Sequence, residues 1–246
     1  ADRFNPRKIF AVSAFLGAIF NCLIIFVSSG SVGILLRILT GITLAGVYPI
    51  AVKLLSQWFP KKRGLAIGIL IAALTLGSSL PHFILLFFSS LDWKFVIISS
   101  SLLALIAAIF IYWILEDAPE TTKSVPFSFK FITTVISNRP VMLANYGYFG
   151  HMWELYAMWT WLPAFLAASF TMYSPDISPS FIALSSFISI GIAGAIGCVF
   201  GGFISDKIGR SNLTIVSMFI SAICSVLIGF TFGEMIWITI ILSIIW

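Results

Sequence analysis

The sequence predicts an all-α, multi-pass membrane protein, and three observations support this prediction. Only 9% of the 246 residues are charged and 60% are hydrophobic, whereas soluble proteins carry about 25% charged residues. Long apolar runs follow one another along the chain, and several reach the roughly 20 residues that a spanning helix needs. These runs are continuous rather than alternating with polar residues, which excludes the strands of a transmembrane barrel. The composition also excludes a soluble globule and a disordered chain.

We expect about eight transmembrane helices, one in each of eight apolar runs. They cover residues 9–29, 33–56, 64–89, 95–115, 141–169, 181–204, 212–231 and 235–246. The last of these runs is shorter than a complete span requires. In the 181–204 run, small residues at Gly191, Gly194, Gly197 and Gly201 are expected to allow close packing against a neighbouring helix.

The positions of lysine and arginine predict how these helices are oriented. Eleven of these residues lie in the loops 1–8, 57–63, 116–140 and 205–211, whereas the opposite loops hold only Lys94. Cytoplasmic loops carry the excess of positive charge, so the first set of loops is expected on the cytoplasmic side of a bacterial inner (plasma) membrane. The net charge of +5 is thus a topology signal, and no nucleic-acid partner is expected.

The longest of the cytoplasmic loops, residues 116–140, is the expected linker between two parts of the chain, 1–115 and 141–246. Four apolar runs precede it and four follow it. Within the linker, the segment 127–137 mixes phenylalanines with polar residues. This pattern is typical of a short amphipathic helix that lies along the membrane surface.

Three short motifs resemble those of the major facilitator superfamily. The segment around residues 202–210 closely resembles its cytoplasmic signature, and the start of the chain resembles the tail of the same signature, with Asn5 in place of a glycine. A third motif, Arg37 followed by Gly41 and Ala45, resembles the fourth-helix motif of the superfamily. The residues that match the cytoplasmic signature are Asp2, Arg3 and Arg7 in the first copy, and Gly202, Asp206, Lys207, Gly209 and Arg210 in the second.

This resemblance implies a twelve-helix transporter of which the chain would be an internal fragment. The visible runs would correspond to helices 3–10, with residues 1–115 as the remainder of the N-terminal half and residues 141–246 as part of the C-terminal half. Such transporters bind their solute near the membrane midplane between the two halves. The resemblance further implies that the signature residues act as a cytoplasmic gate. In this gate Asp206 would face the start of the helix at Gly64, and the contact between them would open during alternating access.

A looser resemblance connects the chain with the branch that contains nitrate/nitrite and cyanate transporters. It rests on Trp58-Phe59-Pro60, on Arg63-Gly64 and on the segment 147–154. The chain departs from that branch in two places, because run 64–89 lacks the asparagine- and glycine-rich nitrate signature and run 181–204 lacks the arginine that nitrate porters use. Nitrate itself is therefore not the expected solute.

The run 141–169 contains the strongest candidates for chemistry. His151 and Glu154 are three residues apart and therefore share one face of a helix. Ionisable residues inside a membrane are functional hypotheses by default, and a buried carboxyl group beside a histidine suits proton coupling. Tyr148 and Trp153 nearby would line a solute cavity or equally be packing residues. A structural alternative is that Glu154 only accepts hydrogen bonds from tryptophan indoles and that His151 is a satisfied core residue.

Two further candidates for solute binding lie in the first part of the chain. Arg37 would hold an anionic solute or take part in proton transfer, as the resemblance suggests, or it would simply extend to the outer membrane interface. Asn21 lies in the middle of its run and is a further candidate for the cavity.

Other chemistries find no support in the sequence. It has no phosphate-binding loop, no complete zinc motif and no nucleophile elbow, and its three cysteines, Cys22, Cys198 and Cys224, lack ligand spacing. An enzyme, a cofactor and a metal are therefore not expected. The expected function is secondary active, proton-coupled transport of a small polar or anionic solute, with the lipid bilayer, the solute and H⁺ as partners. The alternatives are an efflux antiporter for drugs or metabolites and a non-transporting membrane sensor with the same fold.

Overall fold

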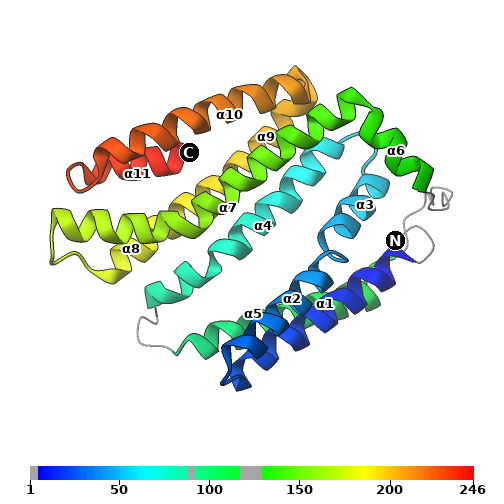
Figure 1. Cartoon of the computed structure of the whole chain (residues 1–246), viewed down its shortest axis with the longest axis horizontal. Coiled ribbons are helices and arrows are strands. Elements are labelled where there is room, and N and C mark those ends of the chain that lie inside the picture. The colour runs from blue at the N-terminus through cyan, green and yellow to red at the C-terminus, as the bar shows by residue number, and fades with distance from the viewer. Residues whose placement is uncertain (1–4, 88–91, 117–128) are drawn as a thin grey trace. The chain divides into compact units, whose positions relative to one another are not determined.

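A computed structural model describes residues 5–87, 92–116 and 129–246, and all regular structure within them is helical (Figure 1). The elements of the first part of the chain are α1 (Pro6–Leu23), the 3₁₀ turn η1 (Ile24–Phe26), α2 (Gly30–Leu44), α3 (Tyr48–Trp58), α4 (Arg63–Phe87) and α5 (Trp93–Trp113). They are followed by α6 (Phe129–Ser137), α7 (Arg139–Tyr173), α8 (Pro179–Ser186), the π-helix η2 (Phe187–Ala193), α9 (Gly194–Ile208), α10 (Arg210–Leu227), the 3₁₀ turn η3 (Ile228–Thr231) and α11 (Ile236–Ile245). The predicted all-α fold class is confirmed for the described part of the chain.

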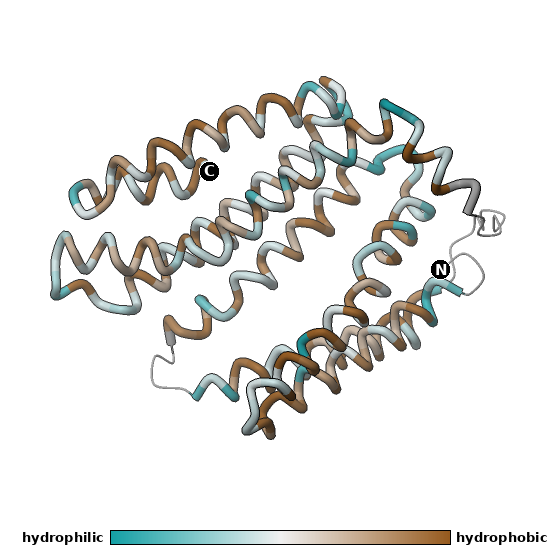
Figure 2. The backbone as a smooth tube through the Cα atoms, viewed as in Figure 1, coloured by the Kyte–Doolittle hydropathy of each residue, from teal (hydrophilic) through white to brown (hydrophobic). Residues whose placement is uncertain are grey.

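Six helical stretches among the described residues are long and apolar enough to cross a membrane. They are Pro6–Phe26, Gly30–Trp58, Arg63–Leu86, Trp93–Trp113, Pro179–Ile208 and Arg210–Thr231. Of the two other predicted runs, α11 is apolar but has only 10 residues. Helix α7 is long enough, with 35 residues, but its tyrosines, tryptophans and ionisable side chains lower its hydropathy, as its paler colour in Figure 2 shows.

Short capping motifs in the sequence fix the first residues of several helices. Asn5 accepts a hydrogen bond from the Lys8 amide at 3.3 Å, and Asn138 accepts one from the Val141 amide at 3.3 Å. A proline follows each cap within the first two helical positions, in α1, α7 and α8. Proline favours these positions because its fixed φ suits a helix start and its missing N–H would have no partner there.

The chain divides into two compact units, which are described separately. The first comprises Ala1–Leu70 and Ser90–Pro126, and the second comprises Ile71–Ser89 and Phe127–Trp246. In the first unit α1 packs against α5, α2 and α3. Its buried face is made of Ala11, Ala14 and Ala18, whose small side chains allow the backbones to approach closely.

The core of the second unit is built on one face of α7. Its buried members there are Met158, Leu162, Leu166 and Phe170, which recur every four residues and pack with residues of η2 and η3. The helix that the linker sequence predicts is present as α6, at Phe129–Ser137. Residues 127 and 128 of that prediction lie outside the described part of the chain. The division at the linker 116–140 remains a prediction. The two compact units divide the chain differently, because the part of α4 from Ile71 onward belongs to the second unit.

Two predicted runs contain breaks that their apolar composition does not indicate. The run 33–56 is interrupted by a turn at residues 45–47, so that Pro49 stands in the first turn of α3. The run 181–204 contains the seven-residue π-helix η2. Such π segments are rare and occur frequently at functional sites.

Glycines of the 181–204 run make the predicted close packing in part. A Cβ added at Gly191 would clash with Ser79 Oγ on α4 and lie 3.0 Å from Ser79 Cβ, and one added at Gly194 would lie 3.5 Å from Thr75 Cβ. By contrast, an added Cβ at Gly197 would meet no atom within 4 Å. Close packing is thus confirmed around η2, where the backbone of the span approaches α4.

We expect Gly191→Ala to destabilise the protein by about 1–3 kcal/mol, because overpacking a tight contact costs about this much. The Ser79→Gly/Gly191→Ala double variant should recover most of the loss, since it removes the two nearest atoms that the new methyl group meets and leaves only Phe187 Cε2 at 3.2 Å. The matched control is Gly197→Ala, which should leave stability nearly unchanged. Thermal unfolding in detergent measures all three, and equal losses at Gly191 and Gly197 would contradict the contact.

Candidate functional site

Glu154 lies at a small cavity of the second unit, where it accepts hydrogen bonds from two other elements. Ser221 Oγ of α10 donates to Glu154 Oε1, and Trp246 Nε1, just after α11, donates to the same oxygen at 3.1 Å. The cavity has a volume of about 140 Å³ and is lined by His151, Glu154, Leu155, Met158, Ser217, Met218, Ser221 and Trp246. The predicted pair on one face of α7 therefore does line one cavity.

The other two candidates on α7 are not among the residues that line this cavity. Tyr148 is half exposed, and Trp153 is 83% exposed. Tyr148 is six residues before Glu154, so the two side chains point about 120° apart around a helix of 3.6 residues per turn. A role for these two residues in solute binding remains a prediction.

Sequence reasoning anticipated a tryptophan donor to Glu154 but missed the serine. Ser217 and Ser221 are four residues apart on α10, so both face the same side of that helix. This spacing of two hydroxyls in an apolar helix was the available signal. Because hydroxyls in helices usually bond to their own backbone, the signal was too weak to select Ser221.

A second polar cluster lies among the helices of the first unit. Asn21 of α1 donates through Nδ2 to Ser101 Oγ at 2.9 Å and to Ser100 Oγ at 3.1 Å, both on α5. Arg37 of α2 donates through Nη1 to Asn21 Oδ1 at 3.1 Å. Asn21, considered only a further candidate from the sequence, is thus the centre that connects three helices.

The Asn21 cluster borders a cavity of about 230 Å³ that carries several hydroxyl groups. Its polar lining includes Ser13, Asn21, Thr40, Ser100 and Ser101, alongside small apolar residues. The run Ser99-Ser100-Ser101 was the sequence signal for the serine side of this cluster. Arg37 itself is exposed. Its guanidinium has five N–H donors, and within the described part of the chain one of them is bonded to Asn21.

The second copy of the cytoplasmic signature forms the turn between α9 and α10. Gly209 has a φ of +89°, a region open to glycine but strained for other residues, so the tight turn requires this residue. Lys207 Nζ lies 4.1 Å from the centre of the Phe203 ring, and Asp206 and Arg210 are exposed. Asp206 and the start of α4 belong to different units, so the predicted gate between them remains a prediction.

The first copy of the signature is only partly within the described residues. Arg7 donates through Nη1 to the Leu115 carbonyl oxygen at 2.6 Å, which connects the start of α1 with the end of α5. Asp2 and Arg3 lie outside the described part of the chain. A structural role for Arg7 in joining two helix ends is therefore supported, and its role in a gate remains a prediction.

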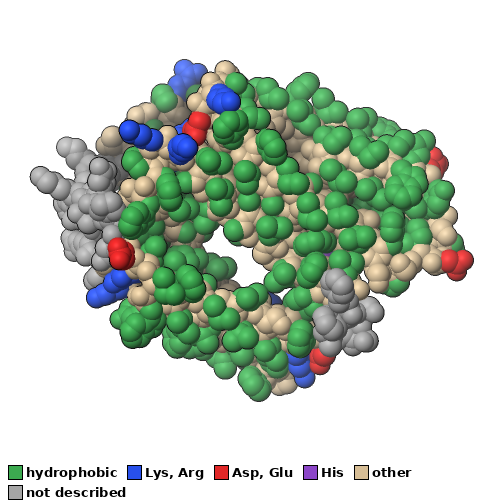
Figure 3. Space-filling model, turned by 180° about the vertical axis from the view of Figure 1, so that it is seen from behind, with side chains coloured by type: hydrophobic (Ala, Val, Ile, Leu, Met, Phe, Trp, Pro, Cys, Tyr) green, Lys and Arg blue, Asp and Glu red, His purple; other side chains and the backbone are tan. Residues whose placement is uncertain are grey.

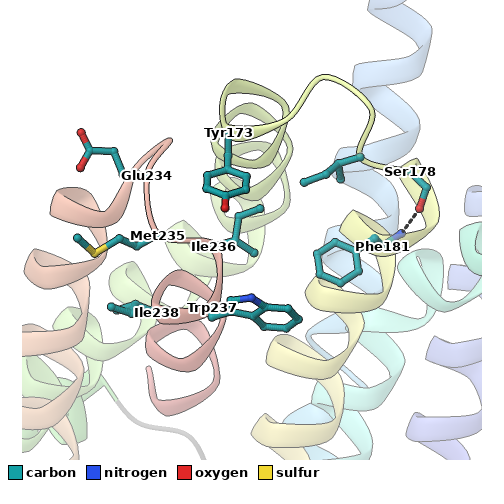
Figure 4. A pocket seen from close by; sticks show the side chains of 9 residues that line it. Tyr173, Ser178, Phe181, Glu234, Met235, Ile236, Trp237 and Ile238 are labelled. Carbon is teal, nitrogen blue, oxygen red and sulfur yellow. Dashed lines mark hydrogen bonds between the residues drawn. The ribbon is translucent and has the colours of Figure 1, made fainter.

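A larger cavity in the second unit was not predicted. It measures about 530 Å³ and lies between the end of α7, the start of α8 and the start of α11. Figure 4 shows Tyr173, Phe181 and Trp237 around it, whereas the carboxylate of Glu234 points away from these rings. Its lining is mainly apolar and aromatic, which fits the side chains that gather at membrane interfaces. Hydrophobic side chains likewise cover most of the surface seen in Figure 3.

Comparison with known proteins connects this geometry with a family. A family model described as the Major Facilitator Superfamily matches residues 1–246. A probable sulfoacetate transporter of Cupriavidus necator is 24% identical over 235 residues, covering 85% of this chain and 51% of the relative. No solved structure gives a significant match.

Two further relatives come from Escherichia coli. A probable L-galactonate transporter is 26% identical over 231 residues, covering 86% of this chain and 49% of the relative. A sialic acid transporter is 24% identical over 199 residues, covering 76% and 45%. The chain therefore spans about half the length of the curated relatives that it matches, and the likeness to the nitrate/nitrite and cyanate branch remains a prediction.

Proposed function

The chain belongs to the major facilitator superfamily of membrane transporters, and on this premise we propose that it serves the proton-coupled uptake of a small organic anion. It is a multi-pass integral membrane protein of a transporter family, not of an enzyme family. The proposal concerns the charge of the solute, the coupling ion and the direction of transport.

The observation that carries the proposal is the position of Arg37. An arginine inside an apolar helix costs several kcal/mol unless it faces protein, water or a ligand. In the first unit its guanidinium is anchored to Asn21 by one N–H, and its planar fork of donors suits a carboxylate or sulfonate oxygen. This geometry supports an anion as the solute.

The relatives support the same charge. The solutes in their names are sulfoacetate, L-galactonate and sialic acid, which are all acids that are anionic near neutral pH. At 24–26% identity the particular acid does not transfer to this chain, but the shared charge agrees with the arginine at the Asn21 cluster.

Glu154 supports proton coupling. Its carboxyl group lies within α7 at a cavity with His151, and these two are the titratable side chains among the residues that line it. A carboxyl group in such a place can take up a proton on one side of a membrane and release it on the other. An inward proton gradient would then drive an anion into the cell against its own gradient.

Uptake into proteoliposomes tests the proposal. We expect the intact protein, as the cell makes it, to accumulate labelled sulfoacetate, L-galactonate or sialic acid when the vesicles are acidic outside. A protonophore should abolish this accumulation. Extrusion of apolar cations without acid uptake would favour the efflux antiporter, and binding of an acid without flux would favour the sensor.

A further inference from the structure

The first unit contains a large apolar cavity that is separate from the Asn21 cluster. It has a volume of about 570 Å³, which is within the range of cavities that hold small organic molecules. Residues of α1, α3 and α4 line it together with residues at the end of α5. They include Phe10, Leu54, Leu55, Trp58, Ile111 and Leu115.

The chemistry of this lining suits a hydrocarbon chain. Of the described residues that line the cavity, Glu116 alone is charged, and the others are apolar or aromatic. A polar solute would lose its hydrogen bonds to water in such a cavity without gaining replacements, whereas a hydrocarbon chain has none to lose. The cavity therefore fits an acyl chain better than it fits the anionic solute proposed for transport.

The cavity lies where several helices end, which places it near one membrane interface. Trp58 is the last residue of α3, and Leu115 follows α5 by two residues. The adjoining loops, 57–63 and 116–140, are those predicted on the cytoplasmic side. Trp58 is also a residue type that gathers at the level of lipid headgroups. An acyl chain in the cavity would thus belong to a lipid of the predicted cytoplasmic leaflet.

Two arginines are held beside the lining of the cavity by bonds to backbone carbonyls. Arg7 Nη1 donates to the carbonyl oxygen of Leu115, itself a lining residue, at 2.6 Å. Arg63 Nη2 donates to the carbonyl oxygen of Ser56 at 3.5 Å, and Ser56 directly follows the lining residue Leu55. The planar fork of a guanidinium matches the oxygens of a phosphate group.

Three lysines extend this basic edge of the cavity. Lys8, Lys61 and Lys62 are exposed, and with the two arginines they make five cations against one carboxylate, Glu116, in the described segments 5–10, 56–63 and 113–116. Basic pockets between membrane helices on the cytoplasmic side bind the headgroups of anionic lipids. We propose that the cavity holds one acyl chain of an anionic phospholipid, whose phosphate is bound by these cations. This lipid site does not depend on the proposed transport of an anion.

Quenching of Trp58 fluorescence by phospholipids with a brominated acyl chain tests the proposal in bilayers that contain the intact protein. The Trp58 signal is the difference between the unmodified protein and Trp58→Phe. We expect brominated phosphatidylglycerol to quench it at a lower lipid fraction than brominated phosphatidylcholine. The Lys61→Gln/Lys62→Gln variant should weaken this preference by about 5- to 25-fold, because each basic residue near an anionic surface contributes about a factor of five.

Two further variants separate a built site from general attraction to the membrane. Lys130→Gln/Arg139→Gln also removes two cations from the predicted cytoplasmic side, in α6 and α7 of the second unit, and should leave the preference unchanged. Ala51→Phe places a ring at the lining of the cavity and should reduce quenching by phosphatidylglycerol while every cation remains.

Three results would overturn the lipid site. Equal quenching by both lipids, unchanged in Ala51→Phe, would show ordinary contact with bulk lipid. An equal loss of preference in the two double variants would show unspecific attraction to surface charge. Absence of quenching by either lipid would show that another part of the intact protein fills the cavity.

Discussion

Acid-driven uptake is expected to fall about 100-fold or more when Glu154 is replaced by glutamine, because a positioned proton-transfer group typically contributes at least that factor. Glutamine keeps the shape and a carbonyl oxygen that can still accept from Ser221 and Trp246. What it loses is the ability to bind and release a proton. The protein should therefore fold and insert normally while its coupling fails.

Exchange of labelled against unlabelled solute separates coupling from solute binding in this variant. Exchange moves no net protons, so Glu154→Gln should retain it while it loses acid-driven uptake. The matched control is Glu234→Gln, the same substitution on an exposed residue between η3 and α11. Equal uptake by Glu154→Gln and the unmodified protein would refute the coupling role and leave Glu154 as a structural acceptor for the serine and the indole.

The membrane-spanning helices of this protein were predictable to a large extent because most of them are long apolar runs. Lipid accepts every apolar side chain, so hydropathy gives the existence of a span but little about its internal geometry. The turn at residues 45–47 illustrates the limit, since it interrupts the run without any polar residue to announce it. Gly46 in this turn lies close to α1, because a Cβ added there would clash with Ser13 Oγ. Pro49 lacks the N–H that a continuous helix would donate to the Ala45 carbonyl oxygen, so hydropathy misses a break that the proline favours.

The candidate sites were predictable only where a residue was out of place in an apolar run. Glu154, His151 and Arg37 were identified in this way, since a charge inside a membrane needs a reason. Ser101 and Ser221 were not, because a serine in a membrane helix normally satisfies its hydroxyl on its own backbone, as Ser225 does. Their importance comes from partners on other helices, at Asn21 and Glu154, which only the folded structure brings within reach.

Replacing Arg37 by glutamine is expected to raise the KM for an anionic solute by about 10- to 100-fold. A hydrogen bond to a charged group contributes roughly 1.5–3 kcal/mol, and each 1.4 kcal/mol corresponds to about one factor of ten. Glutamine retains an N–H₂ group that can donate to Asn21, so the bonds between Asn21 and α5 should survive. Uptake rates over a range of L-galactonate concentrations measure the change.

Lysine at position 37 distinguishes the shape of the guanidinium from its charge. Arg37→Lys keeps the positive charge but loses the planar fork, so it should recover only part of the affinity if two oxygens of the solute bind there. Arg139→Gln, at the start of α7, removes a cation far along the sequence from the Asn21 cluster and should leave KM unchanged. If Arg37 served only to extend to the membrane interface, Arg37→Gln would lower the amount of inserted protein and leave KM as it was. A rise in KM at normal insertion would instead assign Arg37 to the anion.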